Sequence, residues 1–408
     1  MKSLFPIIFI CISIQSFAKT ITVSAGESIG QTIKLAQPYD TILVKNGYFK
    51  ENQLVVTIPL SIIGENFPVV DANFENEIFT VKSNNVLIQG FHFINIGKTS
   101  TIDWAAVKVL ESAYVRIIGN HIERGYFGIY LSASRLCTVE NNVIEGNPSQ
   151  EQNTGNGVHA WKCDSVFINN NSVRGHRDGI YFEFVTNSSI QQNYCEKNIR
   201  YGLHFMFSHN NIYQYNTFRN NGAGVAVMYT KNVKMLNNHF DENLGSSAYG
   251  LLLKDISDSY IENNTFKNNT VGIFMDGTNR SLIQHNQFSE NGWAVKLQAN
   301  CDDNTFTYNN FTKNSFDIAT NGMVVLNHLS KNYWDKYEGY DLNKDGVGDV
   351  AYHPLSIYSS LVEQMPFAMV LWRSFAVFLL DQSERVLPSI TPENLKDDMP
   401  LMKIAKIQ

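Results

Sequence analysis

The chain has 408 residues, of which 44% are hydrophobic, 17% charged and 12% aromatic, and its formal net charge at pH 7 is −6. This composition is that of a soluble globular protein. The negative balance argues against a nucleic-acid partner, because neutralising phosphates requires a basic surface. The length allows two or three ordinary domains, but a repeat array can use all of it as one elongated body.

The first eighteen residues have the features of a secretory signal peptide. Lys2 supplies the positive charge, an apolar run covers residues 4–14, and Ser-Phe-Ala at residues 16–18 forms a small-x-small cleavage site. The apolar run is too short to span a bilayer. We therefore predict a signal peptide at residues 1–18, cleavage after Ala18 and a periplasmic mature protein.

The segments that follow the signal peptide predict the start of a repeat structure. The stretch ESIGQTIKLA, from Glu27, predicts a short amphipathic helix that covers the open N-terminal end. The segments from Asp40 and from Leu60 predict opening turns. Terminal turns of a repeat array need such a cover, because an unpaired strand edge invites aggregation.

From residue 128 the sequence repeats at intervals of 22 to 29 residues. Each repeat starts with a glycine, has apolar residues at the first and third positions after it, and carries an asparagine fourteen positions after it. The glycines are Gly128, Gly157, Gly179, Gly202, Gly224, Gly250 and Gly272, and the asparagines are Asn142, Asn171, Asn193, Asn216, Asn238, Asn264 and Asn286. An apolar residue, often Phe, follows two positions after the asparagine.

Apolar residues at alternate positions predict short strands with one buried face. Strands of four or five residues cannot bury that face alone, so successive coils must stack in parallel. We therefore predict an all-β fold, a single right-handed parallel β-helix, over residues 19–333. The recurring asparagines should form a hydrogen-bonded ladder and the recurring phenylalanines an interior stack.

The outward columns of the predicted coils bring together a candidate copper site. The second and fourth positions after the glycines place His204, Met206, Met228 and Glu183 on one exposed strand face. Imidazole and thioether are ligands that monovalent copper accepts, and a methionine on an exposed face has no packing role. The alternative is that this face is a protein interface without metal.

The polar segment at residues 341–349 resembles the first half of a calcium-binding loop. Oxygen ligands alternate at Asp341, Asn343, Asp345 and Asp349, and the backbone carbonyl of Val347 would complete the set. The twelfth position of such a loop needs a bidentate Glu, and here it holds tyrosine. The alternative is a loop that satisfies its own carboxylates through Asx turns.

Residues 334–408 lie beyond the repeats and predict a polar loop followed by an apolar arm. Residues 366–380 are nearly all apolar, with Arg373 in the middle, and are too few to span a membrane. The arm either folds over the last coil or docks to a membrane partner. The candidate docking residues are Phe367, Met369, Leu371, Trp372, Phe375 and Phe378.

A rival function is polysaccharide cleavage by a lyase or hydrolase, which parallel β-helices commonly perform. Such enzymes need two or three carboxylates that face one another across a groove. The outward columns offer Glu183 and Asp276, which are four coils apart, and the adjacent Asp302 and Asp303, which would point to opposite sides of a strand. We therefore do not expect an enzyme.

Several segments together resemble the NosD family of periplasmic accessory proteins for nitrous-oxide reductase maturation. The most specific are RYGLHFMFS at residues 200–208 and NYWDKYEGYD at residues 332–341. Further matching segments begin at Asp178, Gly224 and Tyr249, and the resemblance covers nearly the whole mature chain.

This resemblance implies copper handling in denitrification rather than catalysis. The implied partners are an ABC transporter made of a membrane subunit and its ATPase, nitrous-oxide reductase, and a copper-donor lipoprotein. His204, Met206 and Met228 lie in two of the family-like segments, which fits the candidate copper face. The resemblance also favours docking as the role of the apolar arm.

Overall fold

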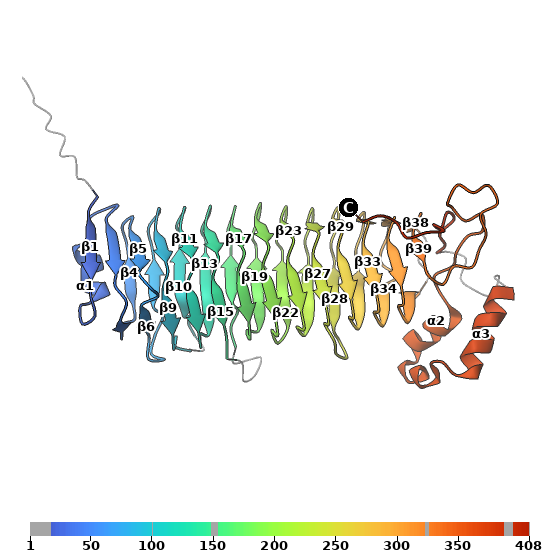
Figure 1. Ribbon diagram of the computed structural model, residues 1–408, viewed down its shortest axis with the longest axis horizontal. Helices are drawn as coiled ribbons and strands as arrows, with labels where there is room; N and C mark the ends of the chain where they lie inside the picture. The colour runs from blue at the N-terminus through green and yellow to red at the C-terminus, as the bar shows by residue number, and fades with distance from the viewer. Residues whose placement is uncertain (1–17, 100, 148–153, 323–325, 387–394, 408) are drawn as a thin grey trace, which may run out of the picture.

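A computed structural model describes residues 18–99, 101–147, 154–322, 326–386 and 395–407. Within these ranges the strands form three parallel sheets that wind into one elongated parallel β-helix (Figure 1). This confirms the predicted fold. The predicted signal peptide lies, except for its last residue, outside the described residues.

Sheet A contains fourteen strands, each paired in parallel with the strand one coil away. Its strands are β1 (Thr20–Val23), β2 (Thr41–Val44), β5 (Ser61–Gly64), β8 (Leu87–Gln89), β11 (Arg116–Ile118), β14 (Thr138–Glu140), β17 (Phe167–Asn169), β20 (Ser189–Gln191), β23 (Ile212–Gln214), β26 (Lys234–Leu236), β29 (Tyr260–Glu262), β32 (Leu282–Gln284), β35 (Thr305–Thr307) and β38 (His328–Ser330).

Sheet B contains thirteen strands and carries the interior aromatic column. Its strands are β3 (Tyr48–Phe49), β6 (Val69–Asp71), β9 (His92–Ile94), β12 (His121–Glu123), β15 (Val143–Glu145), β18 (Ser172–Arg174), β21 (Tyr194–Glu196), β24 (Thr217–Arg219), β27 (His239–Asp241), β30 (Thr265–Lys267), β33 (Gln287–Ser289), β36 (Asn310–Thr312) and β39 (Tyr333–Trp334).

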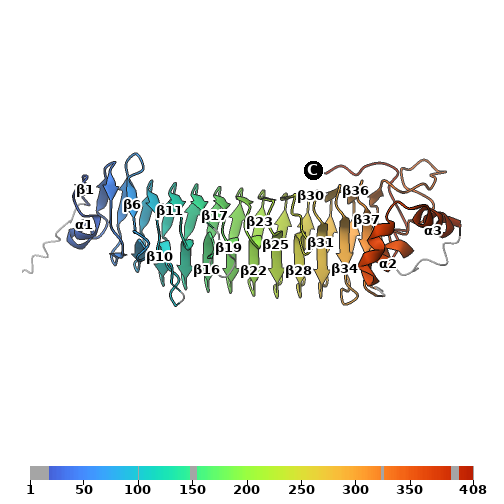
Figure 2. The ribbon, with the colours of Figure 1, turned by 90° about the horizontal axis from the view of Figure 1, so that it is seen from below.

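Sheet C contains twelve strands, which follow the repeat glycines and include the longest strands of the fold (Figure 2). Its strands are β4 (Leu54–Val56), β7 (Phe79–Val81), β10 (Ala105–Leu110), β13 (Phe127–Ser132), β16 (Val158–Trp161), β19 (Asp178–Glu183), β22 (Tyr201–Met206), β25 (Ala223–Met228), β28 (Tyr249–Lys254), β31 (Val271–Asp276), β34 (Trp293–Leu297) and β37 (Phe316–Ala319).

The interior is filled by columns of apolar side chains, as the alternating pattern predicts. In sheet B the rings of Phe240 and Phe266 stack 4.6 Å apart, and those of Phe266 and Phe288 stack 4.9 Å apart. The column ends on Trp334, whose ring lies 4.1 Å from that of Phe311. Stacking therefore continues through the last coil, and each coil buries the face of its neighbour.

The predicted asparagine ladder is confirmed and is longer than the repeats indicated. In each step, the backbone N–H and the side-chain amide of one asparagine donate to Oδ1 of the next, as in the 3.0 Å bonds from Asn216 to Asn238. The ladder consists of Asn120, Asn142, Asn171, Asn193, Asn216, Asn238, Asn264, Asn286, Asn309 and Asn332.

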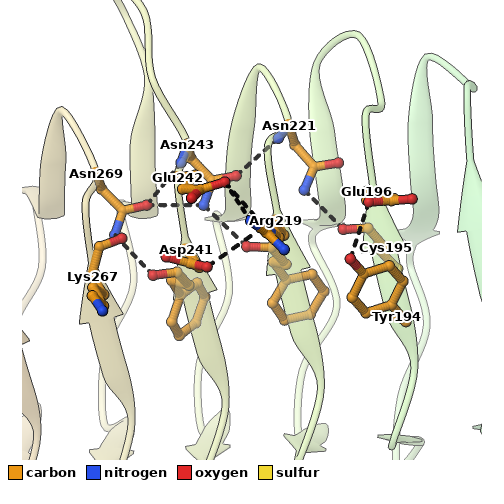
Figure 3. Close-up of polar contacts among 12 residues, drawn as sticks. Tyr194, Cys195, Glu196, Arg219, Asn221, Asp241, Glu242, Asn243, Lys267 and Asn269 are labelled. Carbon is orange, nitrogen blue, oxygen red and sulfur yellow. Dashed lines mark hydrogen bonds and ion pairs between the residues drawn. The ribbon is translucent and has the colours of Figure 1, made fainter.

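A second ladder, which was not predicted, runs from Asn198 to Asn314. Its asparagines follow the C-terminal ends of the sheet B strands, whereas those of the first ladder precede the N-terminal ends. Figure 3 shows its central members, Asn221, Asn243 and Asn269, above a row of charged side chains on the outer surface. Both ladders satisfy buried backbone amides at the corners of the coil. They therefore fix the register of the coils between Asn120 and Asn332.

Helix α1 (Ile29–Leu35) lies at the N-terminal end of the β-helix, as predicted, and packs against the first coils. Ser28 is its N-cap, and Glu51 accepts hydrogen bonds from the amides of Ile29 and Gly30 at 2.7 and 3.0 Å. Ile29 and Ile33 bury their side chains against the stack. These contacts cover the open end of the core.

At the other end, α2 (Ile357–Gln364), the 3-10 helix η2 (Pro366–Leu371) and α3 (Phe375–Val386) fold beside the last coil (Figure 1). A salt bridge of 2.7 Å between Lys296 on β34 and Glu363 on α2 joins them to sheet C. In the described part of the chain, none of these helices combines the length and the apolar character that a membrane span requires.

The chain returns after the helices, and Asp397 terminates the first ladder. Its carboxylate accepts from the backbone and side-chain amides of Asn332, both at 3.0 Å, from the Lys331 amide at 3.2 Å and from the Trp334 indole at 3.1 Å. Asp397 is fully buried. It therefore replaces the asparagine that a further coil would supply.

We predict that Asp397→Ala lowers the free energy of unfolding by on the order of 3 kcal/mol or more, because several buried donors lose their acceptor. The midpoint of urea denaturation measures this change. The adjacent Asp398 is exposed, so Asp398→Ala should change stability by less than about 0.5 kcal/mol. Equal effects of the two substitutions would contradict the role of Asp397.

Candidate functional site

The outer face of sheet C carries a ladder of alternating tyrosine and histidine rings. Consecutive coils place them in register, as the repeat spacing predicts, and neighbouring ring centroids are 4.7, 4.8 and 4.9 Å apart. The members of this ladder are Tyr130, His159, Tyr181 and His204. Beyond His204 the column continues with Ala226.

His204 lies on the outer side of the sheet, but the prediction that it is exposed is wrong. Only 3% of the residue is exposed. The rings of Tyr181 and Tyr201 cover it, with centroids 4.9 and 4.8 Å from the imidazole. Tyr201 is the first residue of β22, directly before the repeat glycine, and its ring lies against the imidazole of His204.

A buried carboxylate orients the His204 imidazole. Nδ1 of His204 lies 3.4 Å from Oδ2 of Asp178, which is itself fully buried. This contact uses Nδ1, so Nε2 is the ring nitrogen that is left for another partner. Nε2 is buried and has no hydrogen-bond partner. This arrangement is that of a metal-ligating histidine with its outer-shell carboxylate.

The other three predicted copper candidates form an adjacent column. Glu183, Met206 and Met228 follow one another in register on β19, β22 and β25, and each is partly buried. The Tyr181 hydroxyl donates to the Met206 sulfur at 3.6 Å. Met206 therefore has a packing partner, contrary to the expectation of a freely exposed thioether. The two methionines lie on neighbouring coils, in a column that is two residues further along the strands than the column of His204.

The donor set of this face fits a soft, monovalent ion. One imidazole nitrogen without a partner and two thioethers are ligands that Cu(I) accepts, whereas hard cations prefer oxygen. Glu183 adds a negative charge at the edge of the group. Register places Glu183, Met206 and Met228 on three consecutive coils, with His204 on the same strand as Met206.

The loop at residues 341–349 satisfies its own carboxylates, so the calcium prediction is not supported. Asp341 accepts from the amides of Asp345 and Gly346, and Asp345 accepts from the amide of Val347. The amide of Asp345 also donates to Asn343, and Asp349 accepts from the Leu342 amide at 2.7 Å. This is the self-bonded alternative, in which backbone amides take the place of a cation.

The predicted docking residues divide into two groups. Met369 and Trp372 pack inward, and the Trp372 ring lies 4.8 Å from that of Phe316 on the last coil. The outer group projects away from the β-helix: Phe367 is 91% exposed, Leu371 47%, Phe375 72% and Phe378 55%. The arm therefore both folds against the last coil and presents an apolar surface.

The two carboxylates considered for a rival enzyme lie on one column. Glu183 and Asp276 are separated by Met206, Met228 and Lys254 in register, which is a distance of four coils. Carboxylates at that spacing cannot act on one glycosidic bond.

Sequence reasoning missed one cluster of ligand-type residues. His92, His121 and Glu123 lie together on the outer face of sheet B. The signal was present in the equivalent segments HFI at residues 92–94 and HIE at residues 121–123, which are 29 residues apart. These coils precede the regular repeats, so their register could not be read from the spacing.

A family model described as "Periplasmic copper-binding protein (NosD)" matches residues 141–344. The chain belongs to the NosD family. The matched residues include the whole Tyr-His ladder except Tyr130, together with both thioethers. The periplasmic location that the N-terminal sequence predicts is confirmed by this family, and copper is the ion that its description names.

Two NosD proteins, each named a probable ABC transporter binding protein, are similar over most of the chain. The protein of Stutzerimonas stutzeri is 27% identical over 374 residues, covering 87% of this chain and 85% of the relative. That of Pseudomonas aeruginosa is 29% identical over 369 residues, covering 86% and 85%. Both relatives are thus named as binding proteins rather than as enzymes.

Solved structures with a similar fold are distant carbohydrate-active enzymes. The α-1,3-glucanase of Streptomyces thermodiastaticus has a TM-score of 0.62 and 13% identity, over 75% of this chain and 65% of its own. An alginate lyase complex has a TM-score of 0.62 and 12% identity, over 78% and 85%. At these identities the likeness shows the fold alone.

We predict that stability falls as the pH decreases below about 6.5, in part because of His159. Burial, and then the nearby Arg177, lower the pKa of His159 from 6.5 to about 3. Between these values the unfolded chain binds a proton that the folded chain does not, so stability present above 6.5 is lost progressively toward pH 3. His159→Phe keeps an aromatic ring and removes this titration.

Urea denaturation at several pH values between 6.5 and 4.5 gives the free energy of unfolding as a function of pH. In the His159→Phe variant this free energy should change with pH less steeply than in the wild type, by up to about 1.4 kcal/mol per pH unit. His239→Phe, at an exposed histidine, is the matched control and should leave the slope unchanged. A slope that is the same in wild type and His159→Phe would contradict the buried, neutral state of His159.

Proposed function

We propose that this NosD-family protein is an accessory factor for assembly of the copper centre of nitrous-oxide reductase. It holds or relays Cu(I) on the outer face of sheet C and docks through its C-terminal arm to the membrane subunit of an ABC transporter. The observation that carries the proposal is the unpartnered Nε2 of His204, oriented by Asp178 and adjacent to two thioethers.

The chemistry of the face supports a transient hold on a cuprous ion. Thioethers are neutral and bind Cu(I) in preference to the divalent ions Zn²⁺ and Mg²⁺. Asp178 fixes the tautomer and the orientation of His204 and raises its basicity as a ligand. The three donors come from two neighbouring coils, so the backbone register holds them in place without a metal.

Access to His204 requires movement of the rings that cover it. Tyr181 and Tyr201 close the imidazole from solvent, and Tyr181 also donates its hydroxyl to Met206. Displacing the Tyr181 ring would expose Nε2 and free the Met206 sulfur in one motion. Contact with a copper donor or acceptor is the event that would drive this displacement.

The apolar arm supplies the surface for a membrane partner. Phe367, Phe375 and Phe378 project from η2 and α3, whereas Trp372 fixes the arm to the last coil. An apolar patch held in this way on a rigid rod is typical of a protein-protein contact. We infer that the transporter's membrane subunit covers it, with the ATPase bound on the opposite side of the membrane.

The same proposal assigns two exchange partners to the outer face of sheet C that carries His204, Met206 and Met228. A copper-donor lipoprotein would load the face, and nitrous-oxide reductase would receive the ion. Both contacts would be made along sheet C, away from the arm, so that one molecule could hold the transporter and an exchange partner together.

We predict that His204→Ala combined with Met206→Ala weakens Cu(I) binding by more than the roughly 10- to 100-fold that loss of an outer-shell partner costs. Competition with a chromogenic cuprous chelator measures the affinity. Asp178→Asn, which keeps the shape but weakens the orientation of the imidazole, should reduce affinity by about 10- to 100-fold.

The matched control is His239→Ala combined with Met399→Ala, which removes one histidine and one methionine from exposed positions. It should bind Cu(I) as the wild type does. In a strain that lacks this protein, the control should restore copper-loaded nitrous-oxide reductase and the site variant should not. Equal Cu(I) binding by the site and control variants would overturn the copper assignment.

We predict that Phe367→Asp combined with Phe375→Asp prevents co-purification with the transporter's membrane subunit and leaves Cu(I) binding intact. Each buried phenylalanine contributes about 1.5–3 kcal/mol, so loss of both reduces affinity by at least roughly 100-fold. Phe74→Asp, at a 61% exposed residue far from the arm, is the control. Retention of the complex by the double variant would contradict docking through the arm.

A further inference from the structure

Two histidines on the outer face of sheet B are stacked with their ring nitrogens directed at one carboxylate. His92 on β9 and His121 on β12 are in register, with ring centroids 4.6 Å apart and planes within 7°. Nε2 of His92 lies 3.4 Å from Oε1 of Glu123, and Nε2 of His121 lies 3.1 Å from it. The three ligand atoms are all within 4.8 Å of one another.

The two nitrogens are close to the carboxylate but make no hydrogen bond with it. Both Nε2 atoms are buried and lack a hydrogen-bond partner. A simple surface ion pair would align an N–H with the carboxylate oxygen. The three ligand atoms are instead grouped closely enough for one metal ion to contact them all.

Glu123 can serve as a metal ligand because neither of its neighbours in register on sheet B is a basic residue. Along this column of sheet B, Glu145 pairs with Arg174 at 2.6 Å, and Arg219 lies 3.6 Å from Asp241 (Figure 3). Glu123 is in register with Ile94 on one side and with Glu145 on the other. Among the ion pairs of the described residues, Glu123 has no Lys or Arg partner and contacts only the two imidazoles.

The three side chains are partly exposed at the surface of the β-helix. The side chains of His92, His121 and Glu123 are 26%, 34% and 32% exposed, so the group lies close to the surface although both Nε2 atoms are covered. Two imidazoles and one carboxylate with an open position form a common donor set for Zn²⁺ and Cu²⁺.

We propose that His92, His121 and Glu123 form a second metal site, which binds a divalent ion of the Zn²⁺ or Cu²⁺ type. It contains no sulfur, so its preference differs from that of the thioether face on sheet C. It also lies before residue 141, outside the segment that the family model matches. The protein therefore has two separate ion sites on different faces of the β-helix.

The test uses the full mature protein, freed of metal, and Cu²⁺ alone as the probe. Electron paramagnetic resonance should show one bound Cu²⁺ per chain with hyperfine splitting from two imidazole nitrogens. His92→Phe and His121→Phe each keep the stacked ring pair and remove one ligand nitrogen. Each should weaken Cu²⁺ binding by more than roughly 10- to 100-fold and remove the two-nitrogen signature. Glu123→Gln should weaken binding while retaining both nitrogens.

His239→Phe is the matched control, because His239 occupies the same column on β27 between two threonines. It should leave the Cu²⁺ spectrum and affinity unchanged, as should His204→Ala combined with Met206→Ala. Circular dichroism verifies that each variant folds. Absence of bound Cu²⁺ in the wild type, or the same spectrum in His92→Phe and His239→Phe, would overturn the second site and leave the Cu(I) face untouched.

Discussion

Register between coils is the constraint on which the rest of this structure depends. The corner amides of each coil are buried and must find acceptors, and the side-chain oxygens of the next coil's asparagines supply them. A slip of one residue would leave these amides unsatisfied and would turn the apolar side chains outward. The ladders thus convert a repeated sequence into fixed columns, and the columns place chemically related side chains beside one another on the surface.

Both candidate ion sites arise from this geometry. Asp178 meets His204, and His92 meets His121, because residues 22 to 29 positions apart in sequence occupy neighbouring coils. Neither group of side chains needs a loop to bring its members together, because strands of neighbouring coils position them. The fold itself is shared with carbohydrate-active enzymes, and function therefore depends on which side chains occupy the outer columns.

The repeat spacing was sufficient to predict the fold, the ladder and the order of residues along the outer columns. It could not predict the burial of His204. The ring of Tyr201, which covers His204, belongs to the residue directly before the repeat glycine, and alternation alone does not assign that position to the outer face. It missed His92 and His121, whose coils lack the regular glycine. It treated packing and docking as alternatives for the arm, whereas the structure shows one residue, Trp372, packed on the last coil and another, Phe367, left exposed.

The position of Asp397 has a mechanical consequence. The arm is inserted between Asn332 and Asp397, which are 65 residues apart in sequence but hydrogen-bonded to each other. The inserted helices are therefore connected to the β-helix at both of their ends, unlike a C-terminal tail, which is connected at one end. If a partner bound to these helices rotated, the β-helix would tilt with it. The coils farthest from the helices would then move through a larger distance than the helices themselves.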